Sequence, residues 1–384
     1  MGRTERGRIL HRRLDECAGK ALVFLAGIAH RVKRFFKPSP PPVQEAKRVG
    51  VLTLGAIGDL LLVTALLAGL RRALPEAQIE VVTSKANEAV VPLLPKSIAS
   101  ASFSITNLCG MLSHIRAARY DILIDTAQWA RVSALVGALS GAARTVGFST
   151  PGQHRHYAFD HVVPHRDDRH EKDNFLALGR ALFPALTGEL DLHIPERPSE
   201  ACKDLPDSKT VFCHMWPSGL HSHLKEWPAE YWGELAIALA DAGYTVIFTG
   251  GPQDAPAAKA FLAQHIPATY LEKKYIFSIA GKADLSDLAF CLRRADAVIS
   301  VNTGIMHLAA IAGAPTIALN GPTNPLRWGP SGPKTCALLP EKGRSAYLNL
   351  GFEYGDTTES VLRHLSVATV RDALAEFGIM LPKS

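Results

Sequence analysis

The chain has 384 residues, of which 47% are hydrophobic and 20% are charged. This composition is typical of a globular protein, and the length exceeds what one core usually supports, so two domains are expected. Residues 1–48 carry 12 Lys/Arg and 4 Asp/Glu, whereas the rest of the chain carries 30 and 32. The body of the protein is therefore slightly acidic, which argues against nucleic acid as its partner.

Cysteine and histidine could indicate redox or metal chemistry. The six cysteines show no CxxC or other regular spacing, and most lie in apolar segments, which is typical of a reducing compartment. Five histidines and three aspartates crowd residues 154–170. Their spacing matches no HExxH or CxxC-type site, so a solvated polar loop is a better explanation than a metal site.

The first 37 residues alternate basic clusters with an apolar run at residues 21–29. This run is too short to cross about 30 Å of hydrocarbon, and no small-residue cleavage site precedes Arg31, which argues against a signal peptide. The pattern predicts a basic amphipathic helix on an anionic membrane surface. A helix docked on the body, or a disordered tail, is the alternative. The proline-rich residues 38–42 predict a stiff spacer, and residues 1–47 form a tail before the first domain.

The next segment predicts the start of a Rossmann-like domain. It reads as a strand at residues 48–54, a tight GAIGD turn at 55–59, a helix at 60–73 and a second strand at 79–83. The turn lacks the G-x-G-x-x-G fingerprint, and the second strand ends in Thr, Ser and Lys rather than in an acid. Binding of NAD or FAD is therefore disfavoured.

Asp59 follows a turn that contains Gly55 and Gly58, at the strand edge where open α/β sheets bind ligands. An acid in this position can simply cap the helix that follows. It can also face a cleft and act as a general base.

The remainder of this half continues in α/β style, with a strand at residues 120–125, a helix at 130–139, a strand at 144–148 and a helix at 174–183. The polar, histidine-rich residues 149–173 predict a long loop.

A proline-rich segment separates a first domain of residues 48–200 from a second of residues 201–384. The strand and helix alternation restarts there and predicts a second doubly wound sheet. Its elements are strands at 210–214, 244–249 and 297–301, helices at 229–242, 256–264, 286–294 and 304–312, and terminal helices within 359–377.

Lys225 lies in the loop after the first strand of this second domain. A lone lysine before a helix is usually solvated. At the carboxyl edge of such a strand, however, a cation would neutralise a diphosphate.

Residues 300–330 predict a strand, a polar hinge at 302–304, a helix and another strand, with almost no spare residues. Met306 and His307 lie in the first turn of the helix. Its free backbone N–H groups and dipole would favour a phosphate or diphosphate. Alternatively, the segment is a simple βα turn with a core histidine.

Three motifs in this order resemble glycosyltransferase family 9, the bacterial heptosyltransferases. They are GAIGD with its apolar helix, the K-x-W-P-x-E-x-W pattern from Lys225 to Trp232, and S-x-x-T-G-x-M-H-x-A-A with G-P-T-x-P-x-R-W-G-P within residues 300–330. The similarity extends over about residues 48–378.

The resemblance implies a GT-B architecture, in which two Rossmann-like domains face a cleft. It implies an inverting glycosyltransferase without cofactor or catalytic metal, an ADP-heptose donor, and a lipid-linked acceptor of the lipopolysaccharide core. A cytoplasmic enzyme, peripheral on the inner face of the cytoplasmic membrane, is expected. Asp59 matches the family's proposed general base, and Lys225 matches its diphosphate-facing lysine. Thr303, Gly304 and His307 match the family's residues around the donor, with Met306 beside them, and Asn302 occupies the donor-site position just before them.

Two positions depart from the family pattern. Asn302 stands where the family usually has aspartate, and Asp254 stands where it often has a glutamate for the nucleotide ribose. A family member that uses another nucleotide sugar, for O-antigen or another surface polysaccharide, is therefore an alternative. A non-catalytic nucleotide-sugar-binding protein at the membrane is a second alternative, against which the retained Asp59 and Lys225 argue.

Overall fold

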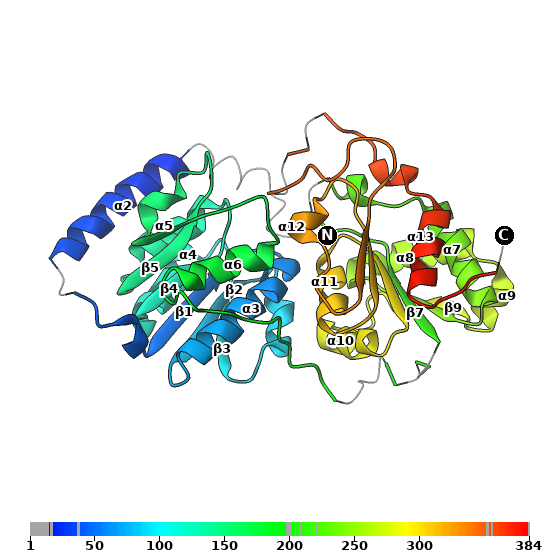
Figure 1. The fold of residues 1–384 in the computed structure, drawn as a ribbon, viewed down its shortest axis with the longest axis horizontal. Helices are drawn as coiled ribbons and strands as arrows, with labels where there is room; N and C mark the ends of the chain where they lie inside the picture. Colours follow the sequence, from blue (N-terminus) through cyan, green and yellow to red (C-terminus); the bar gives the residue numbers. More distant parts are fainter. Residues whose placement is uncertain are drawn as a thin grey trace. The chain divides into compact units, whose positions relative to one another are not determined.

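The computed structural model describes residues 15, 18–36, 39–196, 202–203, 205–206, 209–219, 221–350, 353–354 and 356–382. One compact unit ends at His193 and the other begins at Ile194 (Figure 1). The sequence places the domain boundary slightly later, at residue 200. Each unit is an α/β domain with its own parallel sheet, as expected.

The first unit contains a six-stranded parallel sheet in the order β3-β2-β1-β4-β5-β6. Its strands are β1 (Arg48–Thr53), β2 (Gln78–Ser84), β3 (Ile98–Phe103), β4 (Ile122–Asp125), β5 (Arg144–Ser149) and β6 (His161–Pro164). Strands β1 and β4 are neighbours, with Val49 opposite Ile122. The topological switch point, where such sheets bind ligands, therefore lies between β1 and β4.

Helices cover this sheet. They are α2 (Gly19–Phe35), α3 (Ile57–Ala73), α4 (Leu108–Ala118), α5 (Arg131–Leu139) and α6 (Glu171–Arg180), with the 3₁₀ turns η2 (Val43–Glu45), η3 (Glu88–Leu93) and η4 (Arg155–Ala158). Helix α3 is apolar on nearly all sides because α6 covers the face that the sheet leaves open. It starts earlier than predicted, which places Asp59 inside its first turn.

The second unit repeats this topology with the order β12-β11-β10-β7-β8-β9. Its strands are β7 (Thr210–His214), β8 (Thr245–Phe248), β9 (Ile276–Ser278), β10 (Ala297–Val301), β11 (Thr316–Leu319) and β12 (Thr335–Leu338). Its helices are η5 (Ser222–Lys225), α7 (Ala229–Asp241), η6 (Pro252–Asp254), α8 (Ala255–His265), α9 (Ala268–Glu272), α10 (Leu285–Arg293), α11 (Gly304–Ile311), α12 (Pro325–Trp328), η7 (Val361–His364) and α13 (Val367–Glu376). Here the switch point lies between β7 and β10, where Ser300 pairs with His214.

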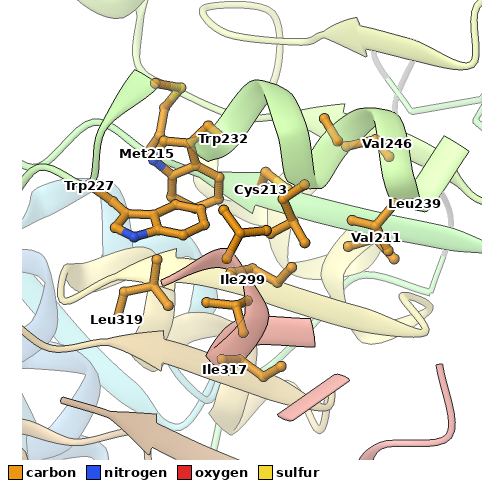
Figure 2. Packing of buried hydrophobic residues seen from close by; sticks show 14 of the residues in the cluster. Val211, Cys213, Met215, Trp227, Trp232, Leu239, Val246, Ile299, Ile317 and Leu319 are labelled. Atoms are coloured by element: carbon orange, nitrogen blue, oxygen red, sulfur yellow. The ribbon is translucent and has the colours of Figure 1, made fainter. Parts of the chain in front are cut away.

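The core of the second unit packs aromatic side chains over this sheet. Figure 2 shows Trp227 and Trp232 beside Cys213 of β7 and Ile299 of β10. The two indole rings meet edge to face with centroids 5.0 Å apart, a favourable geometry for aromatic pairs. The tryptophans of the K-x-W-P-x-E-x-W motif therefore fix the loop that carries Lys225.

The predicted loop at residues 149–173 is wrong, because this segment contains η4, strand β6 and the start of α6. Strand β6 completes the sheet by pairing in parallel with β5. The side chain of Arg155 is fully buried and forms an ion pair with Asp125 of β4. The segment is ordered because Arg155 bonds to β4 and because β6 pairs with β5.

Two acids of this region, Glu171 and Asp160, each lie beside one histidine. His165 Nε2 lies 2.9 Å from Glu171 Oε1, and His30 Nε2 lies 2.9 Å from Asp160 Oδ1. Within the described residues, no group of three or more His, Cys, Asp and Glu side chains could hold a metal ion.

Helix α2 lies beside α5 in Figure 1, as in the docked alternative considered for the tail. The side chains in this contact are Val23, Ala26, Ala134, Ala138, Ala158 and Phe159. The outward face of α2, together with the residue that follows the helix, leaves these apolar side chains exposed: Leu22, Phe24, Leu25, Ile28, Val32, Phe35 and Phe36. The basic clusters before residue 15 lie outside the described residues. In the part of the chain that is described, no helix is both long and apolar enough to span a bilayer.

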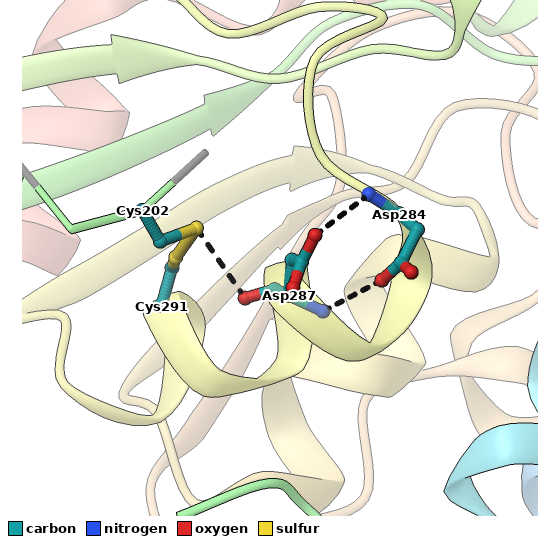
Figure 3. The surroundings of a disulfide bond; sticks show 4 residues. All are labelled: Cys202, Asp284, Asp287 and Cys291. Carbon is teal, nitrogen blue, oxygen red and sulfur yellow. Dashed lines mark hydrogen bonds between the residues drawn. A yellow bond between two sulfur atoms is a disulfide. The ribbon is translucent and has the colours of Figure 1, made fainter. Parts of the chain in front are cut away.

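Cys202 and Cys291 form a disulfide (Figure 3), although cysteines without disulfide partners were expected. The bond joins the segment before β7 to α10, and 89 positions separate the two residues in the sequence. Helix α10 begins with a reciprocal cap, since Asp287 N donates to Asp284 Oδ1 at 2.8 Å. A pairing over this sequence distance has no local motif, which explains why the spacing analysis missed it.

Candidate functional site

The turn between β1 and α3 is organised by Asp59. The backbone N–H of Ala56, which precedes α3 and has no capping side chain of its own, donates to Asp59 Oδ2 at 2.5 Å. A Cβ at Gly55 would lie 2.3 Å from the same carboxylate oxygen. Glycine is therefore needed at residue 55 for the close approach, and Gly58 lies in the first helical turn beside Asp59.

The second oxygen of this carboxylate faces the neighbouring strand. Gln128, which follows β4, donates from Nε2 to Asp59 Oδ1 at 3.2 Å. Both side chains are buried, with Asp59 only 4% exposed. Gln128 was not predicted as a site residue, although its position just past a buried strand at the switch point is a signal that could have found it.

A cavity of about 580 Å³ opens beside this turn. Its walls include residues 54, 55 and 59 of the turn, residues 105, 106 and 108 after β3, residues 126–132 and 135 after β4, and the first turns of α2. The cavity therefore lies at the carboxyl edge of the sheet and includes Asp59 in its wall. Its volume is in the range of small-ligand sites.

Asp15 connects the N-terminal segment to this cavity. Its Oδ1 accepts from the backbone N–H groups of Arg131 at 2.9 Å and of Val132 at 3.0 Å. It thus supplies the carboxylate cap that the amino end of α5 otherwise lacks, since Ala130 has no capping group. Burial raises the pKa of Asp15, although Arg131 and these backbone bonds oppose the shift.

In the second unit, the hinge after β10 leads directly into α11. Thr303 precedes the helix with extended backbone and does not cap it with its side chain. The first N–H groups of α11 therefore remain directed toward the carboxyl edge of the sheet, where an anion could accept from them. Gly304 begins the helix.

Asn302 is held by two acceptors of its own unit. Its Nδ2 donates to Asn320 Oδ1 at 2.7 Å and to the carbonyl oxygen of Trp328 at 2.7 Å. An amide can make both bonds, whereas a carboxylate has no proton for either. The departure from the family's aspartate therefore has a structural reason within this domain.

We expect Asn302→Asp to lower the free energy of unfolding by about 1–3 kcal/mol, because it places a carboxylate against two oxygens. Denaturant titration measures this. Asn107→Asp is the matched control, since Asn107 Oδ1 accepts from Gly110 N at the start of α4 and a carboxylate can do the same. An Asn302→Asp protein as stable as the parent would contradict the assignment of these bonds.

Met306 and His307 both point into the interior of the unit. Met306 is fully buried and His307 is 3% exposed. Their positions favour a role in packing the hinge, although both lie within one turn of it.

Asp254 repeats in η6 the geometry of Asp59. Its Oδ2 accepts from Gly251 N at 2.8 Å, three residues earlier in the chain. Burial raises its pKa. A capping role was considered from the sequence for Asp59, and the structure shows that Asp254 makes the same kind of local bond.

Lys225 ends η5 in the loop after β7. Ser360 Oγ makes bonds to the carbonyl oxygens on both sides of it, at Leu224 (3.1 Å) and Glu226 (2.7 Å). Leu224 is buried, and Trp227 donates from Nε1 to Leu365 O at 2.8 Å. The backbone around this lysine is therefore fixed. Because β10, β7 and β8 are adjacent parallel strands, Asn302, Lys225 and Asp254 all follow strands at the same edge.

His214 ends β7 at this edge and was not predicted as a site residue. Its Nδ1 lies 2.9 Å from Thr249 Oγ1. Burial lowers the pKa of His214 to about 4.

This pKa predicts a loss of stability in acid. The unfolded chain takes up the proton near pH 6.5 and the folded chain only near pH 4, so stability falls as the pH decreases through this window. The loss reaches about 3 kcal/mol below pH 4. Denaturant titrations at several pH values should show a shallower dependence in His214→Asn than in a His364→Asn control, where the histidine is exposed. Equal dependence in both variants would contradict the prediction.

The family model described as glycosyltransferase family 9 (heptosyltransferase) matches residues 109–349. Lipooligosaccharide heptosyltransferase 2 of Haemophilus influenzae is 28% identical over 151 residues, which cover 39% of this chain and 42% of that protein. Lipopolysaccharide heptosyltransferase 3 of Escherichia coli is 25% identical over 295 residues, covering 71% of this chain and 83% of that protein. The match thus spans less than half of the first relative and most of the second.

Among solved structures, that of the E. coli ADP-heptose lipopolysaccharide heptosyltransferase II matches with a TM-score of 0.68 at 21% identity. The match covers 86% of this chain and 98% of that chain. It confirms the expected fold class, two Rossmann-like domains of the GT-B type.

Proposed function

Because the chain belongs to glycosyltransferase family 9, we propose that it is an inverting glycosyltransferase. It moves a heptose from an ADP-activated donor to a lipid-linked saccharide acceptor of the lipopolysaccharide core. One observation carries this proposal: the motifs shared with the family fold at the carboxyl edges of two parallel sheets, where such sheets bind ligands. The sugar and the acceptor class follow from the similarity to lipopolysaccharide and lipooligosaccharide heptosyltransferases.

Asp59 acts as the general base in this proposal. A sugar hydroxyl is a weak nucleophile, so a carboxylate must accept its proton while the new glycosidic bond forms. The bonds from Ala56 N and Gln128 orient the carboxylate beside the cavity. In this proposal the acceptor therefore binds to the first unit, which carries Asp59.

The leaving group is the nucleoside diphosphate, on which negative charge grows as the bond to the anomeric carbon breaks. The amino end of α11, at Thr303 and Gly304, offers N–H groups and a positive dipole, and Lys225 adds a cation. Asp254 would bind the ribose by a hydrogen bond. Asn302 would contribute to donor binding indirectly, because its hydrogen bonds fix the position of the hinge at residues 302–304.

A donor screen tests the function. The protein is incubated with ADP-heptose and other nucleotide sugars, with and without lipid-linked core acceptor, and release of the nucleoside diphosphate is followed. We expect release from ADP-heptose that depends on the acceptor. Release only from another donor would support a family member with a different sugar. Binding without release from any donor would overturn the transferase proposal.

We further propose that the protein is cytoplasmic and peripheral on the inner membrane face, with the outward face of α2 in contact with the headgroups. The apolar side chains of this face are flanked by the exposed cations Lys20, Arg31 and Lys33. A helix with an apolar face and basic flanks is typical of an interfacial membrane helix.

Replacement of Leu25 and Phe35 by serine should weaken binding to anionic vesicles by roughly tenfold or more, because two large side chains no longer leave water. Vesicle flotation measures this. Val162→Ser is the control, because Val162 is an exposed apolar residue of β6, away from α2. Unchanged flotation of the double variant would remove α2 from the membrane contact.

A further inference from the structure

The cavity beside Asp59 has a lining that neither the fold nor the transfer reaction explains. Most of the side chains around it are apolar, including Leu22, Val23, Leu54, Ile105, Leu108 and Leu135. At about 580 Å³ it is roughly four times the size of an apolar cavity that holds one benzene molecule. A saccharide would find few hydrogen-bond partners on such walls.

The charged groups in the lining are engaged by the protein itself. Arg131 pairs with Asp15 at 3.2 Å and donates from Nε to Gln153 O at 2.9 Å. Asp59 accepts from Ala56 N and from Gln128. An apolar occupant would therefore leave these bonds intact.

The cavity is also continuous with the outward face of α2. Leu22 belongs to both, since it lines the cavity and is 48% exposed. Leu25 and Val32 follow it at helical spacing and are exposed as well. The apolar surface thus runs from the cavity along the helix whose flanks carry Lys20 and Lys33.

We propose that this cavity binds a single hydrocarbon chain of the lipid-linked acceptor. The inference rests on the proposed function in that it takes the acceptor as the source of the chain. The chain enters past Leu22 and lies against the apolar walls, the reacting hydroxyl of the saccharide reaches Asp59 in the cavity wall, and the anionic headgroup lies near the cations of α2. The binding energy comes from removing methylene groups from water, so each methylene should strengthen binding roughly fourfold.

Alkyl-chain binding is measured first, without donor or turnover. Octyl, decyl and dodecyl maltosides are titrated below their micelle concentrations, and a brominated dodecyl chain is used to quench tryptophan fluorescence. Trp129 lines the cavity and is the only tryptophan among residues 1–193. We expect affinity to rise with chain length. We also expect Trp129→Phe to remove the part of the fluorescence quenching that saturates as the alkyl chain binds. Affinity independent of chain length, or quenching unaffected by Trp129→Phe, would overturn the proposal.

Variants locate the chain. Ala127→Phe fills the cavity from its wall and should abolish the chain-length dependence, whereas Ala117→Phe, on the exposed side of α4, should not. Leu22→Ser changes a half-exposed side chain, so the fold tolerates it, and it should weaken dodecyl binding at least tenfold. Leu25→Ser should lower vesicle flotation but keep the binding of monomeric chains. Parent-like chain binding in both Ala127→Phe and Leu22→Ser would overturn the assignment.

Acceptors with and without acyl chains separate this inference from the proposed function. A protein that transfers sugar equally to acylated and deacylated acceptors, and binds no alkyl chain, lacks the chain site but keeps its function. A protein that binds alkyl chains but releases no nucleoside diphosphate from any donor has the chain site, and the proposed function fails.

Discussion

Asp59→Asn should lower kcat by about 10²–10⁴-fold, because it removes the carboxylate proposed to accept the proton of the acceptor hydroxyl. Asparagine retains an oxygen for the N–H of Ala56, and the amide of Gln128 can turn to face the new side chain. The turn should therefore keep its fold.

Asp121→Asn is the matched control in the same unit. Its carboxylate also accepts two backbone bonds, from Lys47 N at 2.8 Å and Arg48 N at 2.9 Å, but it lies at the opposite end of β1. The control should keep a kcat within a few-fold of the parent. If a folded Asp59→Asn protein, verified by its thermal midpoint, turned over at the parent rate, Asp59 would not be the base.

Arg155→Met should lower the free energy of unfolding by about 3–5 kcal/mol, because it leaves the carboxylate of Asp125 buried without its cation. The guanidinium also donates from Nε to Ala130 O at 2.9 Å and lies 3.3 Å from Ser133 Oγ. Its loss therefore releases the segment that forms one wall of the cavity. Denaturant titration measures the effect.

Arg166→Met serves as the control for this variant. Arg166 belongs to the same excursion and pairs with Asp168, but both side chains are exposed. Its unfolding midpoint should hardly change, since exposed pairs contribute little. Addition of Asp125→Leu to Arg155→Met should recover part of the lost stability, because no unpaired buried charge then remains. A parent-like midpoint in Arg155→Met alone would show that the pair is not buried as described.

The elements that the sequence predicts well are those whose burial is local and periodic. Strand β1, helix α3 and strand β10 are continuous apolar runs bounded by polar turns, so their types follow from composition and length. The positions of Asp59 and the hinge at residues 302–304 follow from the same boundaries, because parallel strands place the turns after them at one edge.

The elements that the sequence analysis missed depend on distant partners. Strand β6 has only four residues, and it is stabilised by pairing with β5 and by the contact of Arg155 with a strand 30 positions away. The docked side of α2 depends on the small side chains of Ala134 and Ala138, which read as ordinary helix residues. The contact of Gln128 with Asp59 likewise follows only from the pairing of β4 with β1.

The cap that Asp15 supplies has a practical consequence for anyone who shortens this protein. A chain trimmed to begin at Lys47 would lose the carboxylate at the start of α5 and uncover the alanines beneath α2. Removal of residues 1–46 would then change solubility, ligand affinity and membrane binding together. A loss of membrane binding in such a protein could not be attributed to the missing basic residues alone. Point replacements on the outer side of the helix avoid this, because they leave the join with α5 in place.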